Sequence, residues 1–271
     1  MSRKLWIIPL LLIFAIQIPA AGQKKNKKKK AYNELFGKKH ARYKIISDEL
    51  SDASFYIVSG HGGPDPGAMG KYHGKVVTED EYAYDIALRL GRELLRRGAK
   101  VEFIIQDAKD GIRDTKVLKN SKRETCMGKT IPLNQLERLK QRSEAVNKLY
   151  KKDNKKYRRA IFIHVDSRSR GKQIDVFFYH APKSRYGMRL AQNIRDVFDA
   201  KYKHHQPGRG FDGTVEPREL YVLMHTIPVG VFLEVGNIQN PRDQKRLVLE
   251  NNRQAMANWI TQGILKDHKK K

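Results

Sequence analysis

Short apolar segments alternate along this chain with longer segments whose apolar residues recur every three or four positions. The short runs predict buried β-strands at 55–58, 101–105, 160–165, 176–179, 220–224 and 229–233. The periodic segments predict helices at 80–97, 136–150, 186–202, 242–249 and 253–265. Strands that are apolar throughout are buried on both faces, as in parallel sheets covered by helices. We therefore expect a single α/β domain with a mostly parallel central β-sheet flanked by helices on both faces.

The first helix after a strand carries local signals at both ends. Thr78 and Glu81 have the spacing of a capping box, in which each side chain binds the other residue's backbone N–H. Gly98 follows the last periodic residue, where glycine commonly ends a helix. These residues predict a helix that starts next to Glu79.

The amino-terminal segment has the composition of an export signal. Arg3 and Lys4 precede an apolar run at 5–18, and small residues follow at 20–22. Positive charge, a short apolar run and a cleavage site of small residues are typical of a secretory signal peptide. The sequence therefore predicts that residues 1–22 are a signal peptide. The run is shorter than the roughly 20 residues of a spanning helix, although retention as an anchor remains an alternative. Residue 126 is the only cysteine, so an internal disulfide is excluded, and a bacterial periplasm or cell envelope is the expected destination.

Composition divides the rest of the chain into three parts. Residues 23–50 form a basic segment that we expect to be partly disordered, because it begins with a lysine tract. The catalytic domain is expected at 51–265, with a long polar insertion at 107–131 that lacks clear periodicity. Residues 266–271 form a basic tail.

The charge balance bears on the choice of partner. The chain has 55 lysine and arginine residues against 29 acidic residues, a net charge of +26. Nucleic acid is a common partner for such a charge, but an exported protein rarely meets it, and the basic residues do not interleave with stacking aromatic residues. The sequence instead favours anionic envelope polymers or phospholipid surfaces, with solubility alone as the alternative.

Four residues that can carry chemistry lie where predicted strands or helices meet loops. They are His61, Glu79, His164 and Glu234. In parallel sheets, ligands bind beyond the carboxyl ends of strands, so these side chains are expected to converge. Two imidazoles and one carboxylate form a three-ligand zinc site with a position open to water, and a second carboxylate can act as general base. A zinc hydrolase is the leading hypothesis.

Three of these residues also have an ordinary structural explanation, whereas an unpaired carboxylate at the position of Glu234 would be costly to bury. His61 can be a loop histidine in a glycine turn, and Glu79 can stabilise a helix dipole. His164 can be a core histidine bound to a carbonyl. His180 and His225 also lie at the ends of apolar segments and stay unassigned, and nearby Asp65 is expected to cap its turn.

Five separated motifs resemble one family. In chain order they are Gly60-His61-Gly62-Gly63-x-Asp65-x-Gly67-Ala68, Thr78-Glu79, Arg142-x-x-x-Ala145-x-Asn147, Ile163-His164-x-Asp166-Ser167 and Leu233-Glu234-x-Gly236-x-x-x-Asn240. The set is similar to the zinc-dependent N-acetylmuramoyl-L-alanine amidases of bacterial cell walls.

That resemblance implies one Zn²⁺ held by His61, Glu79 and His164, with Glu234 as the catalytic carboxylate. It also implies that the substrate is peptidoglycan, cleaved between the lactyl group of N-acetylmuramic acid and L-alanine. Two alternatives stay open: another zinc peptidase or amidase acting on wall peptides, and a catalytically silent cationic protein that binds the wall. The sequence gives no indication of an activator protein.

Overall fold

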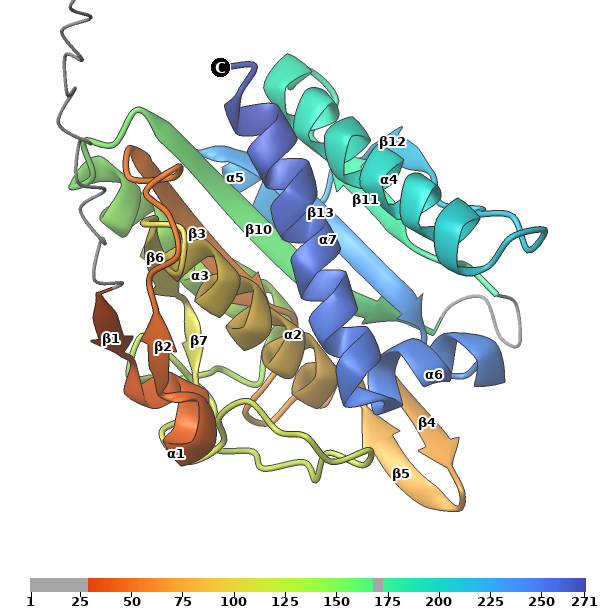
Figure 1. The fold of residues 1–271 in the computed structure, drawn as a ribbon. Coiled ribbons are helices and arrows are strands. Elements are labelled where there is room, and N and C mark those ends of the chain that lie inside the picture. The colour runs from red at the N-terminus through yellow and green to blue at the C-terminus, as the bar shows by residue number, and fades with distance from the viewer. Residues whose placement is uncertain (1–28, 168–172) are drawn as a thin grey trace, which may run out of the picture.

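A mostly parallel β-sheet forms the centre of the molecule (Figure 1). The computed structural model describes residues 29–167 and 173–271. Among these residues, six strands form the sheet in the order β12-β11-β13-β10-β3-β6. Their bounds are β3 (Ala53–Ser59), β6 (Lys100–Phe103), β10 (Tyr157–Asp166), β11 (Phe177–His180), β12 (Val215–Pro217) and β13 (Val229–Asn237). Neighbouring strands are parallel except for β11 and β13, which are antiparallel, so the predicted sheet type is confirmed.

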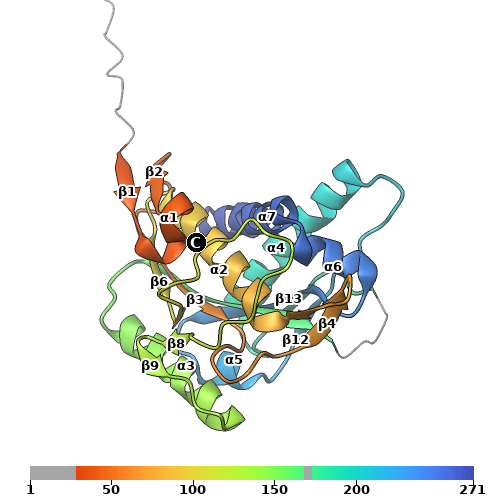
Figure 2. The same cartoon turned by 90° about the horizontal axis from the view of Figure 1, so that it is seen from below.

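Helices cover both faces of this sheet, as the pattern predicts (Figure 2). One face carries α2 (Glu79–Leu95), α4 (Arg185–His205), α6 (Pro241–Val248) and α7 (Glu250–His268). The other face carries α3 (Gln135–Lys151) and α5 (Tyr221–His225). Alternate residues of β3 belong to two different cores: Phe55 and Ile57 pack in the larger one, and Tyr56 and Val58 pack in the smaller one. Burial on both faces explains why the strand is apolar throughout.

One predicted strand is wrong. Residues 220–224 read as a strand, but Tyr221–His225 form α5, which packs against α3. A short apolar run does not distinguish a strand from a helical turn by its periodicity. The Tyr221 and His225 rings lie one helical turn apart and stack with centroids 3.9 Å apart, a contact that only the helical spacing brings about.

The predicted capping box is also wrong. Thr78 occupies the N-cap position of α2, but the reciprocal side-chain bonds are not made within the described structure. The Glu81 carboxylate instead accepts the Ser121 backbone N–H at 2.6 Å and pairs with Arg113 at 2.7 Å. Gly98 does follow the helix end, with a φ of +85°. Tertiary contacts with the insertion therefore replace the local capping interaction.

The segments outside the sheet contain more structure than their composition indicates. In the basic amino-terminal segment, β1 (Lys30–Tyr32) pairs with β2 (Arg42–Lys44), and the link between them contains η1 (Glu34–Phe36) and α1 (Gly37–His40). The insertion includes β8 (Thr125–Cys126) and β9 (Lys129–Thr130), which continue from β7 (Ile105–Gln106). An antiparallel hairpin, β4 (Met69–Tyr72) and β5 (Lys75–Thr78), leads into α2. The basic tail begins as the last turn of α7.

The predicted signal peptide, 1–22, and most of the lysine tract lie outside the described residues. Within 29–167 and 173–271, no helix combines the length and apolarity needed to cross a bilayer.

Candidate metal centre and catalytic cleft

A cavity of about 620 Å³ opens at the carboxyl ends of β3, β10 and β13. His61, Glu79, His164 and Glu234 all line it, so the structure brings the four predicted residues together. The other lining residues come mainly from the loop after β3, from α3 and from α5: Val58, Asp65, Gly67, Ala68, Gln135, Arg138, Leu139, Arg142, Phe162, Val165, Asp166, Ser167, Leu220, Tyr221, Val222 and Phe232.

Glu79 lies between the two histidines. Its Oε1 is 2.9 Å from His164 Nδ1, and its Oε2 is 3.2 Å from His61 Nε2. The same two oxygens accept the backbone N–H groups of Val165 and Ala68, each at 2.9 Å. Burial alone would raise the pKa of Glu79, but the interactions with both histidines outweigh it and hold that pKa well below its usual value. Glu79 is therefore a carboxylate, the form that binds a metal.

His61 is held in place by its own loop. Its Nδ1 lies 2.7 Å from Asp65 Oδ2, which leaves Nε2 directed toward Glu79. A carboxylate bound to the far ring nitrogen fixes the orientation of a metal-binding histidine. Burial lowers the pKa of His61, but hydrogen bonds to Asp65 and Glu79 dominate and raise it to about 10. A metal binds neutral imidazole, so metal binding would release a proton from this residue.

Asp65 has a larger role than the turn cap expected from the sequence. Its Oδ1 does accept the Gly67 backbone N–H, at 3.1 Å. Its Oδ2 also orients His61 and pairs with Arg138 of α3 at 2.6 Å. Asp65 follows His61 by four residues in a glycine-rich turn, and this spacing is the feature of the sequence that could have indicated their contact.

His164 projects from the end of β10 and presents Nδ1 to the cavity. Its ring stacks on Phe232 of β13, with centroids 4.3 Å apart and an interplanar angle of 18°. Burial lowers the pKa of His164 and so favours the neutral ring, the form that binds a metal.

Two glycines make room for these side chains. A Cβ on Gly60 would lie 2.4 Å from His164 Nδ1, and a Cβ on Gly67 would lie 2.6 Å from the His61 ring. Gly67 also has a φ of +67°, which L side chains rarely adopt. Gly60 and Gly67 are therefore required by the packing around the histidines.

These residues fit a metal ion. One ligand atom each from His61, Glu79 and His164 lies within 4.8 Å of the other two. Two imidazole nitrogens and a carboxylate oxygen match the donor set of a catalytic zinc site with one open position. The structure thus contains a candidate metal centre at the predicted residues.

Glu234 lies beside this centre. In the parallel pairing of β10 with β13, it is directly opposite His164, so both side chains point to the same side of the sheet. The Glu234 side chain is buried and lines the cavity next to the histidines. A carboxylate in this position can exchange a proton with a group bound at the metal centre.

Two arginines of α3 tie that helix to the metal-binding loop: Arg142, which belongs to one of the five sequence motifs, and Arg138, which the sequence did not single out. Arg138 pairs with Asp65, and Arg142 donates a hydrogen bond from Nη2 to the backbone carbonyl of His61. Arg142 is buried and forms no ion pair with any described residue. Burial lowers the pKa of Arg142 to about 10, so it remains charged at neutral pH. His61 has a φ of +56°, a backbone conformation that needs such support.

The insertion reaches the same loop from the other side. Glu124 accepts the Gly63 backbone N–H at 2.9 Å and the Ser121 hydroxyl at 2.6 Å. It lies in a buried acidic cluster with Asp80 and Glu81, at the start of α2. Burial, with the neighbouring Glu81 and Glu124, raises the pKa of Asp80 to about 7. The insertion therefore supports the loop that carries His61.

The two unassigned histidines lie apart from the centre. His180 Nδ1 is 2.9 Å from the Ala181 carbonyl, and His225 Nδ1 is 2.9 Å from the Tyr221 carbonyl. Among the described residues that line the cavity, neither is present.

Comparison with known proteins places this fold and site in a family. The profile of Amidase_3, described as N-acetylmuramoyl-L-alanine amidase, matches residues 56–266. The chain belongs to this family. A curated relative, the germination-specific N-acetylmuramoyl-L-alanine amidase of Bacillus subtilis, is 26% identical over 228 residues, which cover 83% of each chain.

Solved structures share the fold. The CwlD amidase of Clostridioides difficile, in complex with the GerS lipoprotein, superposes with a TM-score of 0.59 at 22% identity, covering 80% of this chain and 99% of that chain. The Ami1 amidase of Mycobacterium smegmatis superposes with a TM-score of 0.58 at 16% identity, covering 82% and 99%.

Proposed function

We propose that this protein is a zinc-dependent hydrolase that cleaves the amide bond between N-acetylmuramic acid and L-alanine in peptidoglycan. The observation that carries the proposal is the convergence of His61, Glu79 and His164 within 4.8 Å in one cavity that Glu234 also lines. Membership of the amidase family supports the choice of substrate. The proposed location is the bacterial periplasm or cell envelope, reached through the export signal at 1–22.

The proposed metal ligands are His61 through Nε2, Glu79 through its carboxylate and His164 through Nδ1. Zinc bound there supplies a water of lowered pKa, near 7, and polarises the scissile carbonyl. Asp65 keeps the His61 ring in the orientation that presents Nε2. Arg142 and Glu124 hold the backbone of the loop from opposite sides.

Glu234 is the proposed general base and then general acid. It takes a proton from the attacking water and afterwards delivers it to the departing nitrogen of L-alanine. Phe162, Val222 and Phe232 line the same cavity and supply an apolar surface in it.

Peptidoglycan is the proposed main partner, and the net charge of +26 supports additional attraction to anionic envelope polymers or phospholipid surfaces.

Mass spectrometry of digested peptidoglycan tests the proposal. Purified sacculi incubated with the protein should release stem peptides with a free L-alanine amino group and leave glycan with a free lactyl carboxyl. A chelator should abolish this release, and added zinc should restore it. Cleavage within the stem peptide would instead identify a peptidase, and the absence of any product would favour a silent wall-binding protein.

A further inference from the structure

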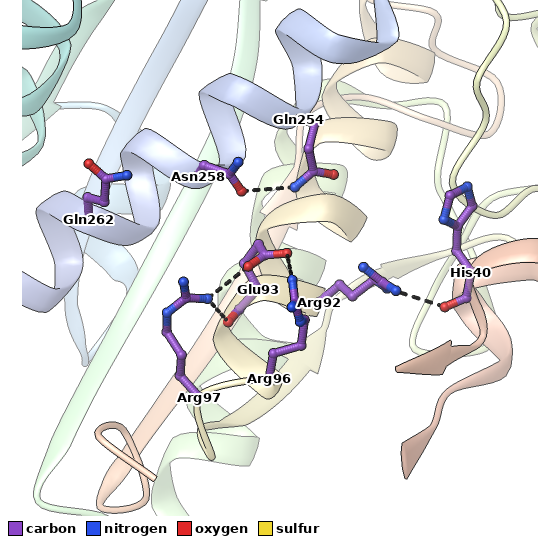
Figure 3. A pocket seen from close by; sticks show the side chains of 8 residues that line it. All are labelled: His40, Arg92, Glu93, Arg96, Arg97, Gln254, Asn258 and Gln262. Atoms are coloured by element: carbon purple, nitrogen blue, oxygen red, sulfur yellow. Dashed lines mark hydrogen bonds and ion pairs between the residues drawn. The ribbon is translucent and has the colours of Figure 1, made fainter. Parts of the chain in front are cut away.

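A second cavity, of about 460 Å³, lies between α2, α7 and His40 at the end of α1 (Figure 3). It is separate from the catalytic cleft. α2 begins at the metal centre with Glu79 and ends beside this cavity with Leu95, about 25 Å away at the rise of an α-helix. The lining residues are polar or charged: His40, Arg92, Glu93, Arg96, Arg97, Gln254, Asn258 and Gln262.

Positive charge exceeds negative charge in this cavity. Arg92, Arg96 and Arg97 line it together with a single carboxylate, that of Glu93. Glu93 is buried and binds Arg96 Nη1 at 2.7 Å and Arg97 Nη1 at 2.8 Å. One carboxylate thus orients two guanidinium groups and leaves each of them with further N–H donors.

Arg92 has no carboxylate of its own. It donates from Nε to the His40 backbone carbonyl at 3.3 Å, and it forms no ion pair within the described part of the chain. Burial, reinforced by the positive charge of Arg96, lowers the pKa of Arg92. A partly buried guanidinium that has no carboxylate partner is stabilised when an anion binds next to it.

Arginines near the carboxyl end of a helix can simply compensate the helix dipole. Here the backbone provides much of that compensation, since the Arg96 carbonyl accepts the Ile46 N–H at 2.7 Å and the Arg97 carbonyl accepts the Leu50 N–H at 2.9 Å. Dipole compensation therefore does not account for three guanidinium groups lining one concavity.

The opposite wall adds uncharged donors. Gln254, Asn258 and Gln262 recur every four residues along one side of α7 and line the cavity. Gln254 donates to Asn258 Oδ1 at 3.0 Å, so these two amides are linked along this wall (Figure 3). Guanidinium groups on one wall and uncharged amide side chains on the other suit an acceptor with several oxygens.

We propose that the cavity between α2 and α7 binds a phosphate group, with Arg92, Arg96 and Arg97 as its cationic ligands. The volume exceeds that of phosphate alone, so the ligand is a substituted phosphate, either a soluble phosphate ester or the headgroup of an anionic phospholipid. This site goes beyond the proposed hydrolysis and differs from a diffuse attraction to negative charge, because it depends on particular residues.

Isothermal titration calorimetry of the full chain tests the site directly and does not depend on amidase activity. The two probes are glycerol phosphate and short-chain phosphatidylglycerol kept below its micelle concentration. Saturable binding of the first supports a soluble ester, and preferential binding of the second supports a lipid headgroup. If neither probe binds saturably, the proposal is wrong.

Variants separate the site from overall charge. Arg92→Gln should weaken binding by roughly tenfold or more, because it removes a charged hydrogen-bonding group from the site. Arg96→Gln, at a partly exposed position, provides the same test if Arg92→Gln does not fold. The matched control is Lys71→Gln, which removes one charge from the exposed hairpin β4–β5 and should change binding by less than about twofold. Equal weakening in the control and in the arginine variants would overturn the proposal.

Discussion

His61 is the residue whose position depends most on its neighbours. Its backbone is in the left-handed region, its ring is oriented by Asp65, and its carbonyl is held by Arg142. Each contact comes from a different direction, so a small change at one of them alters where Nε2 points. His61 supplies the ligand atom, but Asp65 and Arg142 determine where that atom points.

Removal of a ligand should release the metal. The His164→Ala protein, purified with zinc present, should contain far less than one zinc per chain, because two ligands do not complete the site. Elemental analysis measures the content. His225→Ala is the control, since His225 does not line the cavity and its Nδ1 contacts the Tyr221 carbonyl, and this variant should retain the metal. A full zinc equivalent in His164→Ala would refute the assignment of the ligand.

Removal of the base should spare the metal and slow the chemistry. Glu234→Gln keeps the shape of the side chain but cannot accept a proton, so turnover should fall by roughly 10²–10⁴-fold while zinc content is unchanged. Quantitative muropeptide release, with elemental analysis of the same sample, measures both. Near-normal release would assign the base to another group, such as Asp166.

At the element scale, the end of α7 shows how composition can mislead. The segment 266–271 reads as a basic tail, but Asp267 within it is fully buried. Its carboxylate accepts hydrogen bonds from Arg189 Nε at 2.6 Å, Tyr157 Oη at 2.8 Å and Asn193 Nδ2 at 3.2 Å. Through these bonds, the last turn of α7 is joined to α4 and to the start of β10.

Asp267→Asn should lower the free energy of unfolding by about 3 kcal/mol at neutral pH, because Arg159 and Arg189 would lose a buried counter-charge. Burial raises the pKa of Asp267, but the bonds to Arg189 and Tyr157 dominate and lower it. This stabilisation is present above the unfolded pKa, near 4, and is lost as the pH falls through the folded value.

Urea unfolding at pH 7 and at pH 3 measures the effect. The difference in the free energy of unfolding between wild type and Asp267→Asn should be smaller at pH 3 than at pH 7. The control is Asp196→Asn, on the exposed side of α4, which should barely change the free energy of unfolding at either pH. A difference that stays constant with pH would mean that the loss comes from packing instead of charge.

The sequence predicts those elements whose burial is regular. Strands covered on both faces must be apolar throughout, so β3, β10 and β13 could be located, and with them the ends that carry His61, His164 and Glu234. The resemblance to the amidases supplied the roles. The residues of α5 predict a strand instead of a helix, because a short apolar run has no distinguishing period.

Contacts between distant segments could not be predicted in the same way. Asp65 meets Arg138, and Glu81 meets Ser121, only after the chain has folded. The insertion 107–131 looked polar because its buried residues, such as Ile112, Leu118 and Ile131, are single apolar side chains spread along an irregular path. Such a segment packs through individual residues, which leaves no periodic pattern in the sequence.

At the scale of the whole molecule, charge is the dominant property. The net charge is +26, and basic residues occur in the lysine tract, in the insertion and along α3. Such a surface attracts anionic material at long range but contributes little to the chemistry inside a cleft. Attraction to the wall and hydrolysis should therefore respond differently to salt.

Binding to intact sacculi should weaken steeply as salt rises, because exposed charges are screened within about 8–10 Å at physiological ionic strength. Activity on a small soluble muropeptide should change far less. Co-sedimentation at low and high salt measures the binding, with a chain that starts at Gln23 and one that starts at Ala31. Binding by both forms that does not depend on salt would show that the charge serves another purpose, such as solubility.

The order of the strands in the sheet has a consequence for how the protein folds. β13 is the last strand along the chain, yet it lies inside the sheet, between β10 and β11. Parallel pairing of strands so distant in sequence is slow to form, since long loops must close before the contacts that stabilise them exist. Glu234 enters with β13, so a growing chain lacks its proposed base. The topology therefore delays assembly of the proposed catalytic site until β13 has been made and has paired inside the sheet.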